Sequence, residues 1–366
     1  MRNESERELL LKRWGALETE RSSWVSHWRD LSENLLPRNG RFFETDRNRG
    51  SSRINRIADN TGTRAVRILG AGMLGGLTSP ARPWFRLTTA DYDLSQYQPV
   101  KVWLAQVTRQ MQALMAGSNV YRGLHTTYEE LGVFGTHATT VLEDFDAGLH
   151  LYSHTAGEYA LGTDYKGRVD TMGRKFQKTV RQLVTEFGYD NCSQSVRDAY
   201  DNQRYEEWRT VIHMIEPRAD RNTRSRLARD MPFKSVYLEE GGDENQLLRE
   251  SGFDRFRALT PRWITTAQDV YGTSPGMEVL GDVRQLQHQQ LRKSQGIDYQ
   301  TRPPLQAPTS MKHREVDILP GGVTFVDTAV QNGGIRPSFQ ADIRLDFLLT
   351  DIQDVRQRIN SGFNAD

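Results

Sequence analysis

The stretch at 65–87, AVRILGAGMLGGLTSPARPWFRL, limits the possible folds more than any other part of the sequence, because four glycines are followed closely by two prolines. Its hexapeptide GAGMLG fits the dinucleotide-binding pattern G-x-G-x-x-G, which needs a strand before the glycines and a helix that begins directly after them. Apolar side chains recur here every four residues, at Ala65, Leu69, Met73 and Leu77. Since the prolines exclude a following helix, the pattern predicts a helix over about 60–77 and no nucleotide site.

The glycines of this helix need another explanation. Each glycine costs a helix about 1 kcal/mol relative to alanine, so packing has to offset the loss. We therefore expect a face of small residues that lets another helix or a strand approach closely, formed by Gly70, Gly72, Gly75 and Gly76.

Composition places the chain among polar, water-soluble proteins. Its 366 residues suffice for two or three units, and the mean hydropathy is -0.67. A net charge of +1 gives no overall attraction to nucleic acid, so any DNA contact has to come from local patches. The single cysteine, Cys192, excludes an intrachain disulfide and a cysteine-based zinc site, and we expect it to be inert. Without a signal peptide or a membrane-spanning run, the chain is expected to be cytosolic when made.

The N-terminal segment predicts one long amphipathic helix that ends near Pro37 and Gly40. Its apolar side chains step by three and four positions, except for one turn skipped at Arg21. They are Leu10, Trp14, Leu17, Trp24, Trp28, Leu31 and Leu35. We expect the three tryptophans to pack against a neighbouring helix, while base stacking by exposed rings is the alternative.

The remainder of the chain alternates between helical and strand-like patterns. Further helices are expected at 99–116, from 120, at 171–187, at 193–202, after Pro275 and at about 338–360. The helix at 171–187 is predicted from the spacing of Phe176, Val180, Leu183, Val184 and Phe187. Strands are expected at 139–145, 149–154, 157–164, 210–217, 233–240 and 256–266, with a hairpin turn at 164–169. The last three strands would form a compact α/β insert at roughly 205–270.

Candidate catalytic and metal-binding residues are few. Glu143, Asp144 and Asp146 could bind magnesium in a nuclease, whereas carboxylates before Ala-Gly more often form a solvated turn. His150 and His154 have the spacing of a metal pair but lie in a strand-like stretch without a carboxylate to complete a site. Since no nucleophile, base and orienting residue come together elsewhere, we expect no enzyme, no metal and no cofactor.

Three basic segments, 38–57, 217–229 and 312–314, suit phosphate contact or salt bridges between subunits. They occur together with a glutamine-rich helix after Pro275. The apolar residues of that helix are few, namely Met277, Leu280, Val283 and Leu291. Such a narrow stripe is too small for a core helix. We expect each subunit of a ring to contribute one such helix to the ring's wall. Its apolar edge would pack against sister copies, and the inner face of the ring would be solvated.

Several blocks of the sequence, taken in order, resemble one protein family. The run at 58–87 matches the family's small-residue helix followed by LTSP and WF-x-L, and the match continues with FGTHATTVLEDF at 134–145. Further blocks lie at 167–188, 211–218, 271–286 and 351–363, so the match spans nearly the whole chain in family order. The chain thus resembles the head-to-tail connecting, or portal, proteins of short-tailed bacteriophages.

What this resemblance implies is a subunit of a ring, usually a dodecamer, at one vertex of the capsid. Double-stranded DNA would be pumped in through the ring by a terminase and would leave through it during infection. The implied partners are sister copies, DNA bound without sequence specificity, terminase, a tail adaptor protein, and the major capsid and scaffolding proteins, with no membrane. The protein would reside in the virion, after assembly in the host cytoplasm.

The implied fold is mixed, mainly α with α+β parts. It has a wing (1–170 and part of 301–366), a stem (171–204 and 275–300) and an α/β clip (205–274), with the tunnel loop in 301–366. Members of the family usually continue past the last helix into a helical crown. Since this sequence ends at Asp366, a short or absent crown is expected.

Two groups of basic residues receive roles from the resemblance. DNA phosphates in the channel would be met by Lys312, His313, Arg314, Arg284, Arg292 and Lys293. Contacts with sister subunits or tail proteins at the clip would be made by Arg218, Arg221, Arg224, Arg226 and Arg229. Two alternatives stay open, namely a magnesium-dependent nuclease acting on DNA and a nucleic-acid-binding scaffold that works as a monomer or dimer.

Overall fold

The computed structural model describes residues 5–43, 57–225, 227–243, 245–302, 305–306, 336–337 and 345–366. Its contacts divide the chain into two units, Met1–Leu280 with Ile359–Asp366, and Gly281–Arg358. No helix in the described ranges is both long and apolar enough to cross a bilayer.

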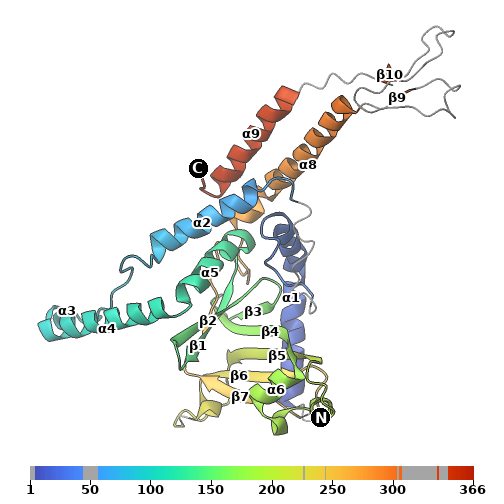
Figure 1. Cartoon of the computed structure of the whole chain (residues 1–366). Helices are drawn as coiled ribbons and strands as arrows, with labels where there is room; N and C mark the ends of the chain where they lie inside the picture. Colours follow the sequence, from blue (N-terminus) through green and yellow to red (C-terminus); the bar gives the residue numbers. More distant parts are fainter. Residues whose placement is uncertain are drawn as a thin grey trace, which may run out of the picture. The chain divides into compact units, whose positions relative to one another are not determined.

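The first unit begins with five helices, shown in Figure 1. They are α1 (Glu6–Asn34), α2 (Thr61–Leu77), α3 (Tyr92–Gln96), α4 (Gln98–Gly117) and α5 (Val120–Phe134). A capping box starts α1, because Ser5 accepts the N–H of Glu8 while the Glu8 carboxylate accepts the N–H of Ser5. Gly135 ends α5 at φ +72°, where an added Cβ would lie 2.1 Å from the Gly272 carbonyl oxygen.

Two antiparallel sheets follow these helices. The larger contains β3 (Tyr159–Thr163), β4 (Val169–Thr179), β5 (Trp208–Pro217), β6 (Phe233–Glu239) and β7 (Arg249–Phe253) in that order. Because neighbours in this sheet are also neighbours in sequence, the strands form a meander. The smaller sheet has the order β2-β1-β8, from β1 (Ala138–Asp144), β2 (Gly148–His154) and β8 (Ala258–Leu259).

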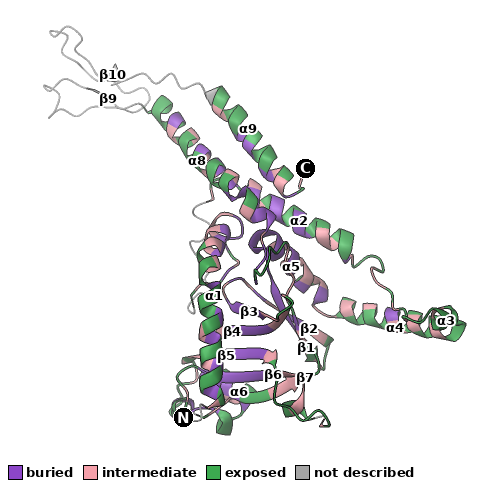
Figure 2. Ribbon diagram, turned by 180° about the vertical axis from the view of Figure 1, so that it is seen from behind, coloured by how far each residue is buried: buried purple, intermediate pink, exposed green. Residues whose placement is uncertain are grey.

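The larger sheet is covered on both faces. On one face α1 runs across the strands, and Leu10, Trp14 and Leu17 pack against Ile212 and Met214 of β5 (Figure 2). An added Cβ at Gly173 would lie 2.7 Å from the Trp14 ring, so only glycine fits beneath that indole. The prediction that the tryptophans pack is confirmed for the buried Trp14 and Trp28. The expected neighbouring helix is present at Trp28, whose indole N–H donates to the Phe134 carbonyl at the end of α5, whereas Trp14 lies against the sheet.

On the opposite face lie two short helices, α6 (Val180–Phe187) and α7 (Gln194–Asp201). Their buried side chains meet Val211 of β5 and Tyr237 of β6 in one apolar cluster. Cys192 is buried in the same cluster, and burial raises the pKa of its thiol to about 11. A thiol that stays protonated at neutral pH is a poor nucleophile, in agreement with the expectation that this cysteine is inert.

The helix predicted at 171–187 is wrong in its first half. Residues up to Thr179 belong to β4, and α6 begins only at Val180. Only the step from Phe176 to Val180 is accidental, because Arg174, Phe176 and Lys178 share one face of a strand with period two. A capping box, Thr179 with Gln182, marks the true start of the helix and is visible in the sequence as T-x-x-Q.

The larger sheet also crosses two of the expected domain boundaries. It joins β3 and β4 to β5, β6 and β7, so the strands of the expected insert do not form a sheet of their own. Strand β7 was not predicted, and the segment at 256–266 supplies only β8 and two isolated bridges. The names wing, stem and clip therefore stay predictions.

Most other predicted elements are confirmed within a few residues. These are α1, α2, α4, α5, α7 and α8 among the helices and β1, β2, β3, β5 and β6 among the strands. The hairpin turn at 164–169 is also present, since Asp164 accepts the N–H groups of Lys166 and Arg168. The short helix α3 was not predicted; Asp91 caps it by accepting two N–H groups.

The second unit contains parts of α8 (Pro275–Thr301) and α9 (Leu345–Gly362), with the short strands β9 (Leu305–Gln306) and β10 (Arg336–Pro337). An ion pair of 3.5 Å joins Arg358 to Asp282, and Gln289 donates a hydrogen bond to Asp351, so the two helices lie side by side.

The apolar edge of α8 has a different environment from the one expected. Val283 and Leu286 are buried on α8, as are Ile352 and Val355 on α9. The prediction that sister copies cover this edge is therefore wrong at these positions, where the same chain provides the neighbouring helix. Farther along α8, Leu291 is 54% exposed and Ile297 is 40% exposed. At that end the apolar edge is open.

Candidate functional site

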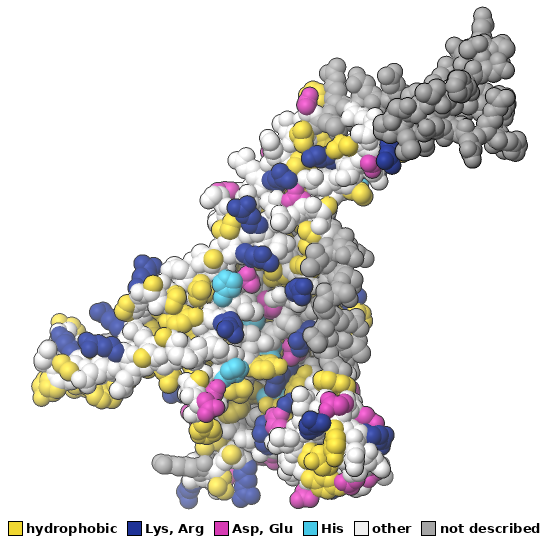
Figure 3. Space-filling model, in the orientation of Figure 1, with side chains coloured by type: hydrophobic (Ala, Val, Ile, Leu, Met, Phe, Trp, Pro, Cys, Tyr) yellow, Lys and Arg dark blue, Asp and Glu magenta, His cyan; other side chains and the backbone are white. Residues whose placement is uncertain are grey.

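Charged side chains do not gather into one patch on the face of the molecule that Figure 3 shows. Figure 3 shows Lys and Arg side chains scattered over the visible face and interspersed with carboxylates. This agrees with the net charge of +1. Any site therefore has to be sought in smaller groups of residues.

The most connected polar group lies beneath the turn that follows α1. The Glu130 carboxylate accepts hydrogen bonds from Asn39 at 2.8 Å and Thr155 at 2.6 Å. His137 places Nδ1 3.0 Å from Glu130 and Nε2 2.9 Å from the Thr139 hydroxyl. An acid, an imidazole and a hydroxyl in line are the parts of a hydrolase triad. All three side chains are at most 2% exposed, so no substrate reaches them, and the group instead ties the turn to α5 and β1.

A second buried group surrounds His154 on β2. Its Nε2 lies 2.8 Å from the Thr140 hydroxyl, and its Nδ1 lies 3.9 Å from Glu158. Burial lowers the pKa of His154 to about 4, so the ring is neutral at pH 7. Arg41 pairs with Glu158 at 3.6 Å on the outer side. Within the described ranges no three His, Cys, Asp or Glu side chains form a metal-binding group, and His154 does not pair with His150.

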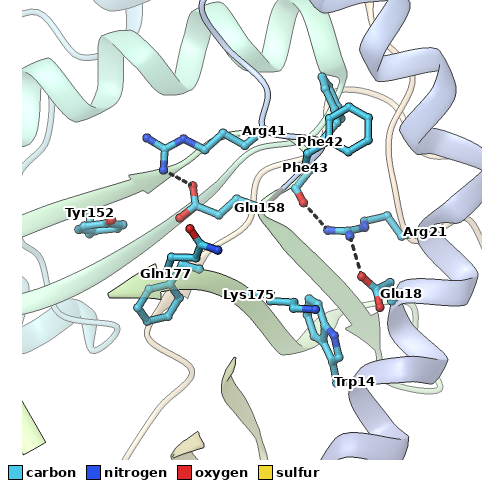
Figure 4. Close-up of a pocket in the computed structure, with 12 residues that line it drawn as sticks. Trp14, Glu18, Arg21, Arg41, Phe42, Phe43, Tyr152, Glu158, Lys175 and Gln177 are labelled. Atoms are coloured by element: carbon cyan, nitrogen blue, oxygen red, sulfur yellow. Dashed lines mark hydrogen bonds and ion pairs between the residues drawn. The ribbon is translucent and has the colours of Figure 1, made fainter. Parts of the chain in front are cut away.

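A pocket of about 490 Å³ lies between α1 and the far end of β4 (Figure 4). Its lining combines aromatic rings with charged groups and comprises Trp14, Glu18, Arg21, Arg41, Phe42, Phe43, Tyr152, Gly157, Glu158, Lys175, Phe176 and Gln177. No sequence pattern indicates this pocket, because its lining comes from four separate stretches of the chain.

The cations of this pocket are already engaged. Arg21 donates to the carbonyl oxygens of Gly157 at 2.8 Å and Tyr159 at 2.5 Å. Arg41 meets Glu158, as Figure 4 shows, and Lys175 donates to Glu240 at 2.8 Å. Without a nucleophile beside a base, the pocket has no evident chemistry, and its polar groups hold α1 to the sheet.

The carboxylates considered for magnesium form a turn. Asp144 accepts the N–H of Asp146 at 2.9 Å and of Ala147 at 3.2 Å, while Glu143 pairs with Arg257 at 2.9 Å. These backbone hydrogen bonds lower the pKa of Asp144. A cation site would need the same oxygens to converge on one point. The nuclease alternative has no support here.

The basic residues expected in a channel separate into three sets. Arg284 and Arg292 lie on the exposed face of α8, where Arg292 donates to His288 at 3.4 Å and to Gln295 at 3.1 Å. Lys293 is half-buried on the other side of the helix, one turn after the buried Gln289. The other three, Lys312, His313 and Arg314, lie outside the described residues.

The arginines expected at the clip also differ from one another. Arg218 is held inside the chain, where it donates to Glu250 at 2.7 Å and to the Ser251 carbonyl at 3.4 Å. Its guanidinium joins the end of β5 to β7 and is not free for a partner. The exposed members are Arg221, Arg224 and Arg229, while Arg226 lies outside the described residues. Partner contact by the exposed three stays a prediction.

The four glycines of α2 have unequal surroundings. An added Cβ at Gly70 would lie 2.7 Å from Glu129 on α5, so this position allows close helix packing. A neighbouring contact, Leu69 against Gly132, has the same character. Gly72, Gly75 and Gly76 are exposed and have no neighbour within 4 Å among the described residues. Close approach at those three positions stays a prediction.

Comparison with known proteins finds related sequences along the whole chain. The family described as bacteriophage head to tail connecting protein matches residues 7–366. A probable portal protein of Bordetella phage BPP-1 is 57% identical over 366 residues, which is 100% of this chain and 66% of that protein. A portal protein of Salmonella phage epsilon15 is 46% identical over 364 residues, covering 99% of this chain and 66% of its own length. The chain thus spans about two thirds of each relative.

Among solved structures, the neck of an empty GTA particle, computed with C6 symmetry, is similar over 88% of this chain and 70% of its own. The identity is 10% and the TM-score is 0.40.

Proposed function

This chain belongs to the family of bacteriophage head to tail connecting proteins, and on that premise we propose that it is a phage portal subunit. Copies of it assemble into a ring, of twelve as is usual in the family, at one vertex of the capsid. Double-stranded DNA passes through the ring during packaging and again during ejection. The match over residues 7–366, together with 57% and 46% identity to two portal relatives, carries this proposal.

A duplex that has to slide through a ring must not be held tightly. A good base contact is worth about 1–3 kcal/mol and would act as a trap at every matching sequence. Contacts with phosphates are independent of sequence and are screened by salt. Few such phosphate contacts are available on α8, where the exposed Arg284 and Arg292 are about two turns apart. Lys312, His313 and Arg314 are the other residues proposed to contact phosphates.

The remaining parts of the proposal concern partners and location. Terminase and a tail adaptor protein bind the ring from outside, and the major capsid and scaffolding proteins surround it. The exposed Arg221, Arg224 and Arg229 are the residues assigned to these contacts. The protein is incorporated in the virion after its synthesis in the host cytoplasm.

The decisive experiment is to determine the mass and shape of the purified full chain. Light scattering should give a mass of many multiples of 42.0 kDa, and electron microscopy should show annular end-on views. A homogeneous monomer or dimer at all protein concentrations would overturn the proposal and favour a small nucleic-acid-binding scaffold.

Charge reversal tests the channel residues separately. Arg284→Glu with Arg292→Glu should lower the amount of packaged DNA while leaving the ring intact, because both side chains are exposed. The double variant Lys312→Glu with Arg314→Glu should lower the amount of packaged DNA in the same way. Glu278→Lys, an exposed change on the same helix, is the control. Normal genome yield in both double variants would remove these residues from the channel.

A further inference from the structure

The turn between β1 and β2 displays an aromatic ring with no cover. Phe145 is 101% exposed, more than any other large apolar side chain in the described ranges. The turn that carries it is well defined, since Asp144 accepts the N–H groups of Asp146 and Ala147. Gly148 closes the turn at φ +78°, and an added Cβ there would lie 2.5 Å from Leu114 of α4. A fixed turn thus presents an apolar ring between two exposed or half-exposed carboxylates, Asp144 and Asp146.

A groove of about 560 Å³ elsewhere in the same unit has complementary properties. It lies between the extended segment at 83–88 and helices α3 and α4. Apolar side chains in its lining include Phe85, Leu87, Leu104 and Ala105, while its charged members are Arg86, Lys101 and Arg109. No carboxylate lines it. Figure 3 shows hydrophobic side chains and Lys or Arg side chains side by side over α3 and α4.

The groove is preformed by hydrogen bonds that hold its two walls together. The Leu87 N–H donates to the Thr108 hydroxyl at 3.1 Å, and Gln112 donates to the Phe85 carbonyl at 3.2 Å. Its cations are available: within the described part of the chain neither Arg86 nor Arg109 has an ion pair, and Lys101 donates only to the neutral Gln96 at 3.0 Å. Apolar side chains beside cations that have no ion pair among the described residues can bind an aromatic side chain flanked by carboxylates.

The chain's own turn does not fill its own groove, because Phe145 is fully exposed. The two surfaces also lie on different sides of α4. The turn packs against Leu114, whereas the groove includes Thr108, six residues earlier. At about 100° per residue, these positions are about 120° apart around the helix. Two distinct complementary surfaces on one chain are what a head-to-tail contact between identical copies requires.

We infer that Phe145 of one copy inserts into the groove between the 83–88 segment and α4 of the next copy, with Asp144 and Asp146 meeting Arg86 and Arg109. This contact rests on the proposed assembly of copies and names the surfaces that join them. Because the contact is head-to-tail, it closes into a ring when the rotation between copies is a simple fraction of a turn.

Cysteine cross-linking in the full chain tests the contact. Ala147→Cys and Ala105→Cys, both at exposed positions, place one thiol beside Phe145 and one in the groove while Phe145, its carboxylates and the groove's arginines stay in place. The native Cys192 is buried and contributes no background. A short bismaleimide should convert the double variant into a ladder of covalent oligomers on a denaturing gel. Each single variant should run as a monomer on this gel. So should the control that combines Ala105→Cys with Lys166→Cys, since Lys166 lies on the other exposed hairpin turn.

The outcomes separate this contact from the proposed function. Rings by electron microscopy without a ladder would overturn the contact and leave the ring proposal standing. A chain that neither assembles nor cross-links would overturn both. An equally strong ladder from the Lys166→Cys control would mean that the cross-links form in random encounters between chains, and this would also overturn the contact.

Side-chain exchange provides a second test that does not depend on the cross-linker. Phe145→Ala should lower the yield of assembled protein at least tenfold, and Tyr165→Ala, at a 90% exposed aromatic on the other turn, should not. Asp146→Arg should also weaken assembly, and Arg86→Glu with Arg109→Glu in the same chain should restore it. Full assembly of Phe145→Ala, or failure of the exchange to restore Asp146→Arg, would contradict the contact.

Discussion

Helices α1 and α4 both have an apolar stripe at helical spacing, but the two stripes have different surroundings. On α1, Leu10, Trp14 and Leu17 are at most 4% exposed because the larger sheet covers them. On α4, Trp103 is 60% exposed and Leu114 is 44% exposed, and the only buried residue is Thr108. The difference teaches that periodicity identifies the apolar face of a helix without indicating what covers it. One stripe builds the core, whereas the other stays largely exposed in this chain.

The largest effect should come from removing a tryptophan on each helix. Trp14→Ala deletes a ring packed on Gly173 and Met214, and such deletions cost about 3–5 kcal/mol. Trp103→Ala removes a mostly exposed ring and should leave the free energy of unfolding within about 0.5 kcal/mol. Urea unfolding of the two variants measures this. Equal losses would mean that α4 is covered like α1.

Acid should act on the core beside α1 through buried histidines. The folded-state pKa of His154 is about 4 against 6.5 in an unfolded chain, so the unfolded state binds the proton first. Stability is then fully present above pH 6.5 and is lost as the pH falls toward 4, by about 3 kcal/mol for this residue. Burial lowers the pKa of His213 as well, so it adds in the same direction. His154→Gln should make the pH dependence of stability shallower. An unaltered slope in His154→Gln would contradict this account.

A smaller effect should distinguish the arginine inside the chain from the exposed arginines near it. Arg218→Ala removes two hydrogen bonds, one of them to the Glu250 carboxylate, and should cost about 1–3 kcal/mol. Arg221→Ala, at an exposed position, should cost less than about 0.5 kcal/mol. Thermal unfolding compares the two. Equal stability would return Arg218 to the group of possible partner contacts.

The smallest of these effects should come from the residue that separates β4 from α6. Thr179 caps α6 by accepting the N–H of Gln182, and loss of such a cap costs about 1 kcal/mol. Thr179→Ala should show that loss, whereas Thr179→Ser, which keeps the hydroxyl, should recover most of it. No difference between the two variants would mean that packing alone sets this boundary.

The candidate sites were only partly accessible to sequence reasoning. The helix after Pro275 is confirmed as α8. Arg284 and Arg292 are exposed on it, and their contact with DNA stays a prediction. The groove along α4 could not be predicted, because its floor joins an extended segment to a helix that begins ten residues later. Phe145 was overlooked although its sequence, Asp-Phe-Asp-Ala-Gly, indicates a turn with an aromatic tip.

The sequence by itself determined the features that depend on near neighbours. Helix α2 instead of a nucleotide loop, the turn at 144–147 and the capped start of α6 each depend on residues within a few positions. The tertiary structure alone decided that 171–179 is a strand, since β4 gains its hydrogen-bond partners from β3 and from β5, which begins about thirty residues later. It also decided that α1 packs on a sheet and that α9 covers part of α8. Hydrogen bonds within a helix are local, whereas strand pairing and burial depend on chain segments that only the fold brings together.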